Sequence, residues 1–403
     1  MNILILSYKN IITKPLQTFL TVLILSLSIG LLLGVKQLNK VFESQLEQSL
    51  NGIDMVVGAK GSPLQLVLSA VLHIDNPTGN ISYTEAQKIA KGKYIEEAIP
   101  ISIGDNYKGY KLVGTTTSFI DLHKTSLDNG SLFKAPFEVV LGNAVAKNLN
   151  LKIGDTFSSA HGMIENAIES HDENPLKVVG ILKPTQNVID RLIVTNLESI
   201  WHLHEHEDQH EEKNTEIHNH EDDEITALLV LFSNKMGLLR LPRMINKDTP
   251  FQAALPKYEL DKLFQFTAIA TNAITWIAWA ILLVSGISMF VSLYRMVKER
   301  AKELALVRTY GASRNTLIRL VFTQGLLIGF ISFSIGTFIA SIGLQAIFSS
   351  IEKTYKQQIY LLEYSQDIFE LLLFIFGIIC VSTLIAIYPI FKMDISKILS
   401  NEN

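Results

Sequence analysis

The chain has 403 residues, of which 48% are hydrophobic and 18% are charged, and its formal net charge is −4. Its mean hydropathy of +0.26 favours a membrane protein, and its length allows two or three units of domain size. The single cysteine, Cys380, excludes a domain held together by disulfide bonds.

Four long uncharged stretches interrupt the chain, at residues 15–35, 263–294, 320–351 and 371–391. A helix needs about 20 residues, at about 1.5 Å each, to cross a bilayer core roughly 30 Å thick. All four stretches reach that length, and four buried core helices of this kind would be very unusual in one soluble chain. We therefore predict a membrane α-helical protein with four transmembrane helices.

The distribution of Lys and Arg predicts the topology. Residues 295–319 hold seven Lys and Arg against two Glu, and Lys9, Lys14, Lys392 and Lys397 lie in the two terminal segments. Cytoplasmic segments near membrane helices are enriched in Lys and Arg, so both termini are predicted to be cytoplasmic. The predicted organisation is a cytoplasmic N-terminal tail (1–14), transmembrane helix 1 (15–38), an extracytoplasmic domain (39–262), helix 2 (263–294), a cytoplasmic coupling loop (295–319), helix 3 (320–348), a short external loop (349–367), helix 4 (368–391) and a cytoplasmic C-terminal tail (392–403).

The first apolar stretch has a second interpretation, a cleaved signal peptide. It is longer than a typical signal core, and no small-residue cleavage site follows at residues 35–37. An anchor that continues outward as a helix through Val41, Leu46 and Leu50 fits better.

The extracytoplasmic domain alternates strand-like and helix-like runs. Residues 63–72 are apolar but too short to span a membrane, so they predict a core helix or a patch at the membrane surface. Thr195 and Glu198 have the spacing of a capping box and predict a helix start, whereas Gly154 predicts a turn. Strands are predicted at 138–141, 178–182, 192–194 and 225–232, with helices at 144–149 and from about residue 234. This order indicates an inserted α+β domain.

A histidine-rich, acidic stretch lies inside this domain. Residues 202–224 contain ten acidic residues against one Lys, so the stretch carries −9 and the rest of the chain +5. Such a composition predicts a solvated, disordered loop at 201–224. Imidazoles beside carboxylates suit Zn²⁺, Ni²⁺ or Cu²⁺, and a plain hydrophilic loop is the alternative. The candidate metal ligands are His202, His204, His206, His210, His218 and His220. His73 and His123 stand alone in the sequence and predict ordinary surface or partly buried side chains.

No phosphate-binding loop of the G-x-x-x-x-G-K-[ST] type is present, since the nearest string, residues 58–62, has the wrong spacing. No Ser/His/Asp or Cys/His arrangement indicates nucleophilic catalysis. The chain is therefore not predicted to be an enzyme, and any ATP hydrolysis would belong to a separate subunit.

The coupling loop carries the most informative motif. Residues 298–308 predict a helix that continues helix 2, with charged residues spaced three apart. Gly311 predicts a helix C-cap, and Ser313 predicts the N-cap of a short amphipathic helix at 314–320.

This string resembles the E-R-x-x-E-(L/I)-x-x-x-R-x-x-G-A-x-R signature of ABC transporter permeases of the MacB/FtsX/LolCDE type, the membrane subunits of type VII systems. The residues that match are Glu299, Arg300, Glu303, Leu304, Arg308, Gly311, Ala312 and Arg314. The runs from Val139 to Asp155 and from Val178 to Asp190 are similar to the family's external domain. The ending from Tyr388 to Leu399 is similar to the family's C-terminus.

The resemblance implies a homodimer or heterodimer of permeases in the bacterial inner membrane, each bound to an ATPase subunit through the coupling loop. It assigns Glu299, Arg300, Glu303, Arg308, Gly311, Ala312 and Arg314 to that contact. ATPase motion would then pass to the periplasmic domain, which exports or extracts a substrate or acts on a periplasmic or outer-membrane partner. No nucleic acid partner and no resident cofactor are predicted, apart from Zn²⁺ at the histidine-rich loop.

Two alternatives fit the same architecture. One is the permease of a metal-linked, zinc transport system, and the other is a membrane regulator that relays conformational change to a cell-wall hydrolase. A stand-alone channel is disfavoured because no polar face runs through the four predicted spans.

Overall fold

The computed structural model describes residues 3–13, 15–161, 175–208, 223–311, 313–355 and 365–391. The chain divides into two compact units. The helical unit comprises Met1–Val41, Ala268–Ile347 and Leu361–Asn403, and the inserted domain comprises Phe42–Thr267 together with Phe348–Tyr360.

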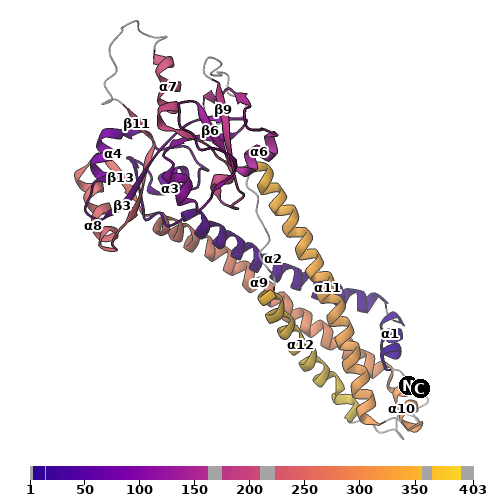
Figure 1. The fold of residues 1–403 in the computed structure, drawn as a ribbon. Coiled ribbons are helices and arrows are strands. Elements are labelled where there is room, and N and C mark those ends of the chain that lie inside the picture. The colour runs from indigo at the N-terminus through magenta and orange to yellow at the C-terminus, as the bar shows by residue number, and fades with distance from the viewer. Residues whose placement is uncertain are drawn as a thin grey trace. The chain divides into compact units, whose positions relative to one another are not determined.

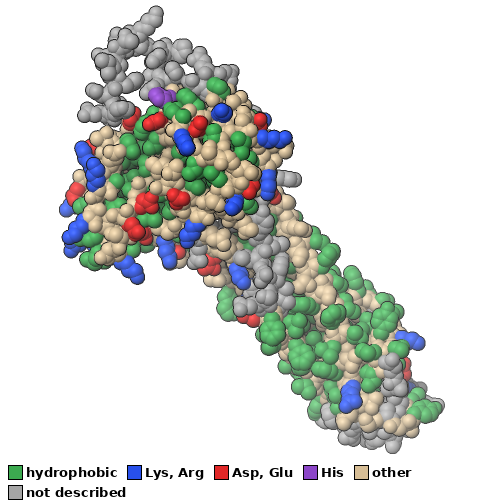
Figure 2. Space-filling view, viewed as in Figure 1, with side chains coloured by type: hydrophobic (Ala, Val, Ile, Leu, Met, Phe, Trp, Pro, Cys, Tyr) green, Lys and Arg blue, Asp and Glu red, His purple; other side chains and the backbone are tan. Residues whose placement is uncertain are grey.

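The helical unit is built on four long apolar helices, each long and apolar enough to cross a membrane. Figure 2 shows hydrophobic side chains gathered on the visible face of this unit, as expected for a surface whose solvent is lipid. The prediction of four transmembrane helices is therefore confirmed. The helices with residues in this unit are α1 (Ile3–Thr13), α2 (Pro15–Leu50), α9 (Pro256–Glu299), α10 (Ala301–Thr309), α11 (Arg314–Tyr355) and α12 (Ser365–Phe391) (Figure 1).

Small residues let these helices approach closely. A Cβ added to Gly336 of α11 would lie 2.8 Å from Ile29 Cβ of α2, and one added to Gly329 would lie 2.3 Å from Ile379 Cδ1 of α12. Between α2 and α9, the hydroxyls of Ser28 and Ser285 are 2.8 Å apart and hydrogen-bonded. Without a hydrophobic force between helices in lipid, such close contacts and hydrogen bonds hold the bundle together.

The helices extend beyond the predicted membrane spans. Residues 3–13, in the segment predicted as the N-terminal tail, form the helix α1. α2 continues to Leu50, as expected for an anchor that runs outward, and α11 continues to Tyr355. The predicted C-terminal tail at 392–403 lies outside the described residues.

The inserted domain contains a mixed sheet of eleven strands among the described residues, in the order β13-β1-β12-β3-β4-β10-β6-β9-β5, with β7 paired to β9 and β8 to β3. A separate pair is formed by β2 and β11. The strands are β1 (Met55–Ala59), β2 (Ile81–Ser82), β3 (Ile95–Tyr107), β4 (Tyr110–Thr115), β5 (Leu127–Gly130), β6 (Glu138–Leu141), β7 (Thr156–Phe157), β8 (Ala160–His161), β9 (Leu176–Leu182), β10 (Ile193–Asn196), β11 (Glu224–Ile225), β12 (Ala227–Phe232) and β13 (Phe251–Ala254). The helices are α3 (Pro63–Ala70), α4 (Tyr83–Ala90), α5 (Ser118–Leu122), α6 (Asn143–Leu149), the 3₁₀ helix η1 (Val188–Arg191), α7 (Leu197–Asp208) and α8 (Met236–Asp248).

Successive side chains of a strand point to opposite faces of the sheet. Both faces are apolar here, and helices cover each of them to form two cores. In β1, Val56 packs in one core with α3 and α5, whereas Met55 and Val57 pack in the other with α4 and α8. The pairs β4–β10 and β6–β9 are parallel, and the remaining pairs are antiparallel. The predicted α+β class of this domain is confirmed.

Most predicted elements of the domain are present, and the exceptions have local causes. The strand predicted at 225–232 is divided at Thr226, whose hydroxyl accepts a hydrogen bond from the backbone N–H of Ile103 at 2.9 Å. The helix predicted to start near Thr195 does start there, but its cap is Asn196, whose Oδ1 accepts the backbone N–H of Ser199 at 3.1 Å. Gly154 has φ +95, as a turn requires.

His73 and His123 are buried, contrary to prediction, and each is 4% exposed. Both pack against the ring of Phe119, with centroid distances of 6.1 Å and 4.6 Å. Burial lowers the pKa of His123 to about 4. Burial, together with the positive charges of Lys111 and Arg191, also lowers the pKa of His73 well below its usual value.

Candidate functional site: the connection between α9 and α11

The connection between α9 and α11 contains a helix of its own, α10. α9 ends at Glu299 and α10 begins at Ala301, so the helix predicted to run unbroken from 298 to 308 is interrupted at Arg300. α10 is anchored by Ala305, which is completely buried. The predicted short helix at 314–320 is likewise not separate, because it forms the first two turns of the continuous α11.

Arg300 joins this connection to α1. Its guanidinium donates to Asn10 Oδ1 and, at 2.5 Å, to Thr13 Oγ1, and it lies 3.8 Å from the Glu303 carboxylate. The Glu303 side chain is 70% exposed, so that ion pair adds little. The two hydrogen bonds to α1 use the planar fork of the guanidinium and fix the position of α10 relative to α1.

α1 also contacts the base of α11. The buried hydroxyl of Ser7 donates to the backbone carbonyl of Leu320 at 3.3 Å. Sequence reasoning missed α1 as part of the site, although the spacing of Ile3, Leu6, Ser7 and Asn10 is helical. These four positions form the side of α1 that packs on the bundle.

The corner after α10 has the predicted chemistry. Gly311 has φ +95, a left-handed conformation that suits glycine, and a Cβ added there would meet nothing within 4 Å. Ser313 Oγ then accepts the backbone N–H of Thr316 at 3.3 Å and caps α11. The predicted C-cap at Gly311 and N-cap at Ser313 are confirmed.

The outer side of α10 is exposed and mixes apolar with charged side chains. Tyr310 is 89% exposed and Leu306 is 47% exposed, beside the exposed Lys302 and Glu303. Tyr310 is thus a large, exposed aromatic side chain beside the Gly311 corner, and Tyr is a residue type enriched at protein interfaces. Sequence reasoning did not single out Tyr310. The sequence feature that could have indicated Tyr310 is an aromatic residue directly before the capping glycine, in a segment that is otherwise rich in charge.

The other predicted coupling residues lie on the same connection. Glu299 is exposed at the end of α9, Arg308 is in the last turn of α10, and Arg314 begins α11. Ala312 lies outside the described residues. The Arg300 side chain is hydrogen-bonded to Asn10 and Thr13 of α1.

The histidine-rich stretch begins as a helix. Residues 201–208 belong to α7, which corrects the prediction that the whole of 201–224 is a loop. His202 is exposed on α7, and His204 and His206 also lie on this helix. His210, His218 and His220 lie outside the described residues. Among the described residues, no group of three or more His, Cys, Asp or Glu side chains is placed to hold a metal.

Two family models match the chain. The MacB-like periplasmic core domain matches residues 18–230, more than half of the chain, and the FtsX-like permease C-terminal domain matches residues 276–395. The chain belongs to the MacB/FtsX family of ABC transporter permeases. The second match contains the whole α9–α11 connection.

Two solved structures are similar to parts of this permease. One is the periplasmic region of MacB from Actinobacillus actinomycetemcomitans, with 14% identity, coverage of 53% of this chain and 95% of that one, and a TM-score of 0.33. The other is the extracellular domain of the noncanonic ABC-type transporter YknZ from Gram-positive bacteria, with 10% identity, coverage of 49% and 98%, and a TM-score of 0.31. A comparison with curated protein sequences gives no significant match. The assignment therefore rests on the two family models.

Proposed function

We propose that this permease is one of two membrane subunits of an ATP-driven complex in the bacterial inner membrane, with both chain termini in the cytoplasm. A separate ATPase binds the α9–α11 connection, and its motion passes along the membrane helices to the inserted, periplasmic domain. That domain then exports or extracts a substrate. The permease residues that contact the ATPase are Glu299, Glu303, Arg308, Gly311, Ala312 and Arg314, together with Leu306 and Tyr310.

The observation that carries this proposal is the exposed ring of Tyr310 on a fixed corner. α10 is held on its inner side by the buried Ala305 and at its start by Arg300. Its exposed side is therefore presented in one orientation, and a partner gains contact area there without the cost of ordering the corner. Because α10 lies directly between α9 and α11, a displacement of α10 moves two membrane helices at once.

The proposal is tested with Tyr310→Ala in the full-length chain, expressed in its native cell with an affinity tag. A buried aromatic anchor contributes about 2 kcal/mol or more to an interface, so the Kd for the ATPase should rise by roughly 30-fold and less ATPase should be recovered. The control is Tyr258→Ala, which removes a 62% exposed ring from the first turn of α9. The ATPase is identified by mass spectrometry as a co-purifying chain with a phosphate-binding loop.

Gly311→Val provides a second test, because a β-branched residue is strained at φ +95 although space for a Cβ is open. This variant should insert normally and lose ATP-dependent activity. Unchanged ATPase recovery and unchanged cellular function in both variants would leave α10 as a simple tether and remove the main support for coupling through it.

A second candidate function, metal-linked transport, is favoured by one feature of α7. Positions 202 and 206 are four residues apart on this helix and so share one face. A His-x-x-x-His spacing on a helix suits Zn²⁺. We propose that His202, His204, His206, His210, His218 and His220 capture Zn²⁺ or Ni²⁺ with roughly micromolar affinity, which weakens in acid because protons compete with the metal for the ligands.

Calorimetric titration of the purified full-length chain with ZnCl₂ tests this second function. His202→Ala with His206→Ala should weaken Zn²⁺ uptake at neutral pH, whereas His73→Ala, a buried histidine elsewhere, should not. An absence of Zn²⁺ uptake by the unmodified chain would exclude the metal-linked function and leave the ATPase proposal intact.

A further inference from the structure

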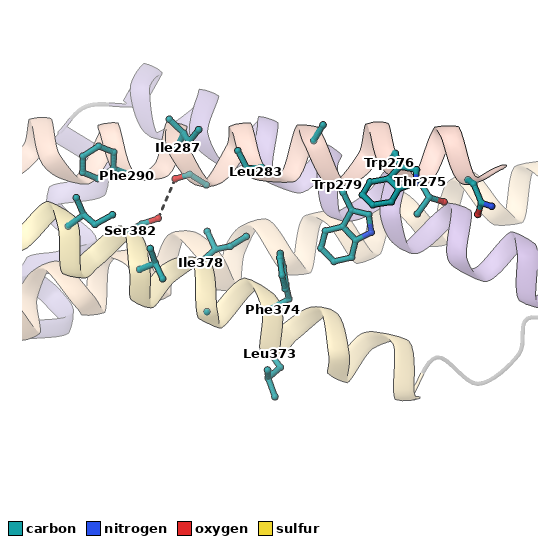
Figure 3. Close-up of a pocket in the computed structure, with 16 residues that line it drawn as sticks. Thr275, Trp276, Trp279, Leu283, Ile287, Phe290, Leu373, Phe374, Ile378 and Ser382 are labelled. Carbon is teal, nitrogen blue, oxygen red and sulfur yellow. Dashed lines mark hydrogen bonds between the residues drawn. The ribbon is translucent and has the colours of Figure 1, made fainter. Parts of the chain in front are cut away.

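The two units differ in where they place ionisable side chains. In the helical unit, the large groove between α9 and α12 has no ionisable side chain among the described residues that line it (Figure 3), so it has no charge with which to hold a polar ligand. In the inserted domain, four basic side chains lie close together on the sheet face that α3 and α5 cover. They are His73 after α3, Lys111 of β4, His123 after α5 and Arg191 of η1.

Two of these cations hold the chain segment around His73. Arg191 Nη2 donates to the carbonyl of Leu72, and Lys111 Nζ donates to the carbonyl of Asp75 at 2.8 Å. Leu72 and Asp75 flank His73 in the sequence, so both positive charges lie near its ring. His73 has φ +51, a left-handed backbone conformation that is uncommon outside glycine. The fold therefore holds His73 in a rare conformation next to two cations.

The His73 ring has no hydrogen-bond partner among the described residues. It is 4% exposed, yet neither Nδ1 nor Nε2 makes a hydrogen bond. Buried polar side chains are nearly always hydrogen-bonded, so each exception needs a physical explanation. A ligand that accepts a hydrogen bond from the ring would supply the missing partner.

The charges around His73 select the kind of ligand. Burial, followed by the positive charge of Arg191, lowers the pKa of Lys111 to about 8, although Asp75 opposes the shift. Burial, followed by the charges of Lys111 and Arg191, also lowers the pKa of His73. Asp75 is exposed, and its Oδ1 accepts the backbone N–H of Asn76 at 2.8 Å. The surroundings of the ring are thus positive, so they repel a metal cation and stabilise an anion.

We propose that Lys111, Arg191 and His73 form a site for an oxyanion, the phosphate or carboxylate group of a small ligand. Lys111 and His73 donate hydrogen bonds to the anion, and Arg191 supplies a second positive charge. Ammonium and guanidinium groups bind phosphate and carboxylate through short, charge-assisted hydrogen bonds. Lys111 is the least buried of the three, so the anion enters on its side. His123 takes no part, because its Nδ1 is already hydrogen-bonded to Asn51.

The site lies wholly within the inserted domain, so its test does not depend on the ATPase contact. The full-length chain in detergent is titrated in a calorimeter near neutral pH with sodium phosphate and, separately, with sodium acetate, and sodium chloride keeps the ionic strength constant. Lys111→Met removes the charge and keeps most of the apolar stem. It should raise the Kd for phosphate about tenfold or more, the usual effect of losing a charge-assisted hydrogen bond. Lys183→Met, at an exposed lysine of the same domain, is the control and should leave the Kd unchanged.

His73→Phe is the second variant. It keeps a ring against Phe119 and removes both ring nitrogens, so it should also raise the Kd roughly tenfold. Trp201 fluorescence, in a Trp276→Phe, Trp279→Phe background, shows whether the inserted domain of each variant is folded. Tighter binding of phosphate than of acetate would assign a phosphate-bearing ligand, and the reverse would assign a carboxylate. The proposal is overturned if the unmodified chain binds neither anion, or if the Kd is unchanged in either folded variant.

Discussion

Because His123 is buried in its uncharged form, we expect the inserted domain to lose stability in mild acid. Asn187 Nδ2 donates to Asn51 Oδ1 at 3.0 Å, so Asn51 must present its Nδ2 to His123 Nδ1, 2.6 Å away. His123 Nδ1 is therefore an acceptor, and the ring is neutral. Protonation would place an N–H against another N–H in a site that is 4% exposed.

The size of the effect follows from the two pKa values. Burial lowers the pKa of His123 from 6.5 to about 4, so between these values the unfolded chain binds more protons than the folded one. Stability is then complete above pH 6.5 and falls as the pH drops toward 4. At about pH 4.5 the loss from His123 is about 2.5 kcal/mol, and His73, whose pKa is also lowered, adds to it in the same direction.

Urea unfolding of the detergent-solubilised chain at about pH 7.5 and about pH 4.5 measures this loss. The reporter is Trp201, whose Nε1 donates to the carbonyl of Glu224 at 2.8 Å, in a Trp276→Phe, Trp279→Phe background. His123→Asn retains an acceptor near the Nδ1 position and removes the titration. It should start less stable, having lost the ring contact with Phe119, and should lose about 2.5 kcal/mol less on acidification. The same pH dependence with and without His123→Asn would refute this reasoning.

Three further predictions concern packing and hydrogen bonding. Gly336→Leu should destabilise the helical unit by about 1–3 kcal/mol and so lower its thermal midpoint, because an added Cβ would lie 2.8 Å from both Ser26 O and Ile29 Cβ. Gly343→Leu is the control, because a Cβ added there would meet nothing within 4 Å. Equal midpoints of the two variants in scanning fluorimetry would contradict the contact. Asp190→Ala should destabilise the inserted domain by about 2–3 kcal/mol in urea unfolding. The Asp190 carboxylate accepts hydrogen bonds from the backbone N–H groups of Thr185 and Gln186 and from the Thr185 hydroxyl. Asp121→Ala, at an exposed position, is the control and should have little effect. Asn196→Ala should cost about 1 kcal/mol and increase hydrogen exchange in the first turn of α7, and unchanged exchange there would show that its cap is dispensable.

Composition and local spacing predicted the architecture because a bilayer imposes length and charge rules that are read directly from the sequence. The four spans, the Gly311 corner and the Ser313 cap are of this kind. The break at Arg300 was not predictable, because it depends on hydrogen bonds to Asn10 and Thr13, almost 300 residues earlier in the chain.

The inserted domain shows the same division between local and long-range effects. The apolar runs in the sequence correctly predicted strands. The strand predicted at 225–232 is nevertheless divided at Thr226, because the Thr226 hydroxyl accepts a hydrogen bond from the backbone N–H of Ile103 on another strand. The burial of His73 and His123 also depends on chain segments brought together only by the fold, so two isolated histidines carried no sequence signal of their buried state. Tertiary contacts of this sort override local propensity.

The position of β1 has a consequence for biosynthesis. β1 is the first strand of the domain to be made, yet its two neighbours in the sheet are β12 and β13, both of which follow residue 226. At roughly 5–20 residues per second, a ribosome needs about 8–34 s to make the intervening chain. Throughout that time Met55, Val56 and Val57, all fully buried in the finished domain, have no strand to pair with. β1 therefore stays unpaired and prone to aggregation until both of its partner strands have been made, and the second of them, β13, ends just before α9 begins.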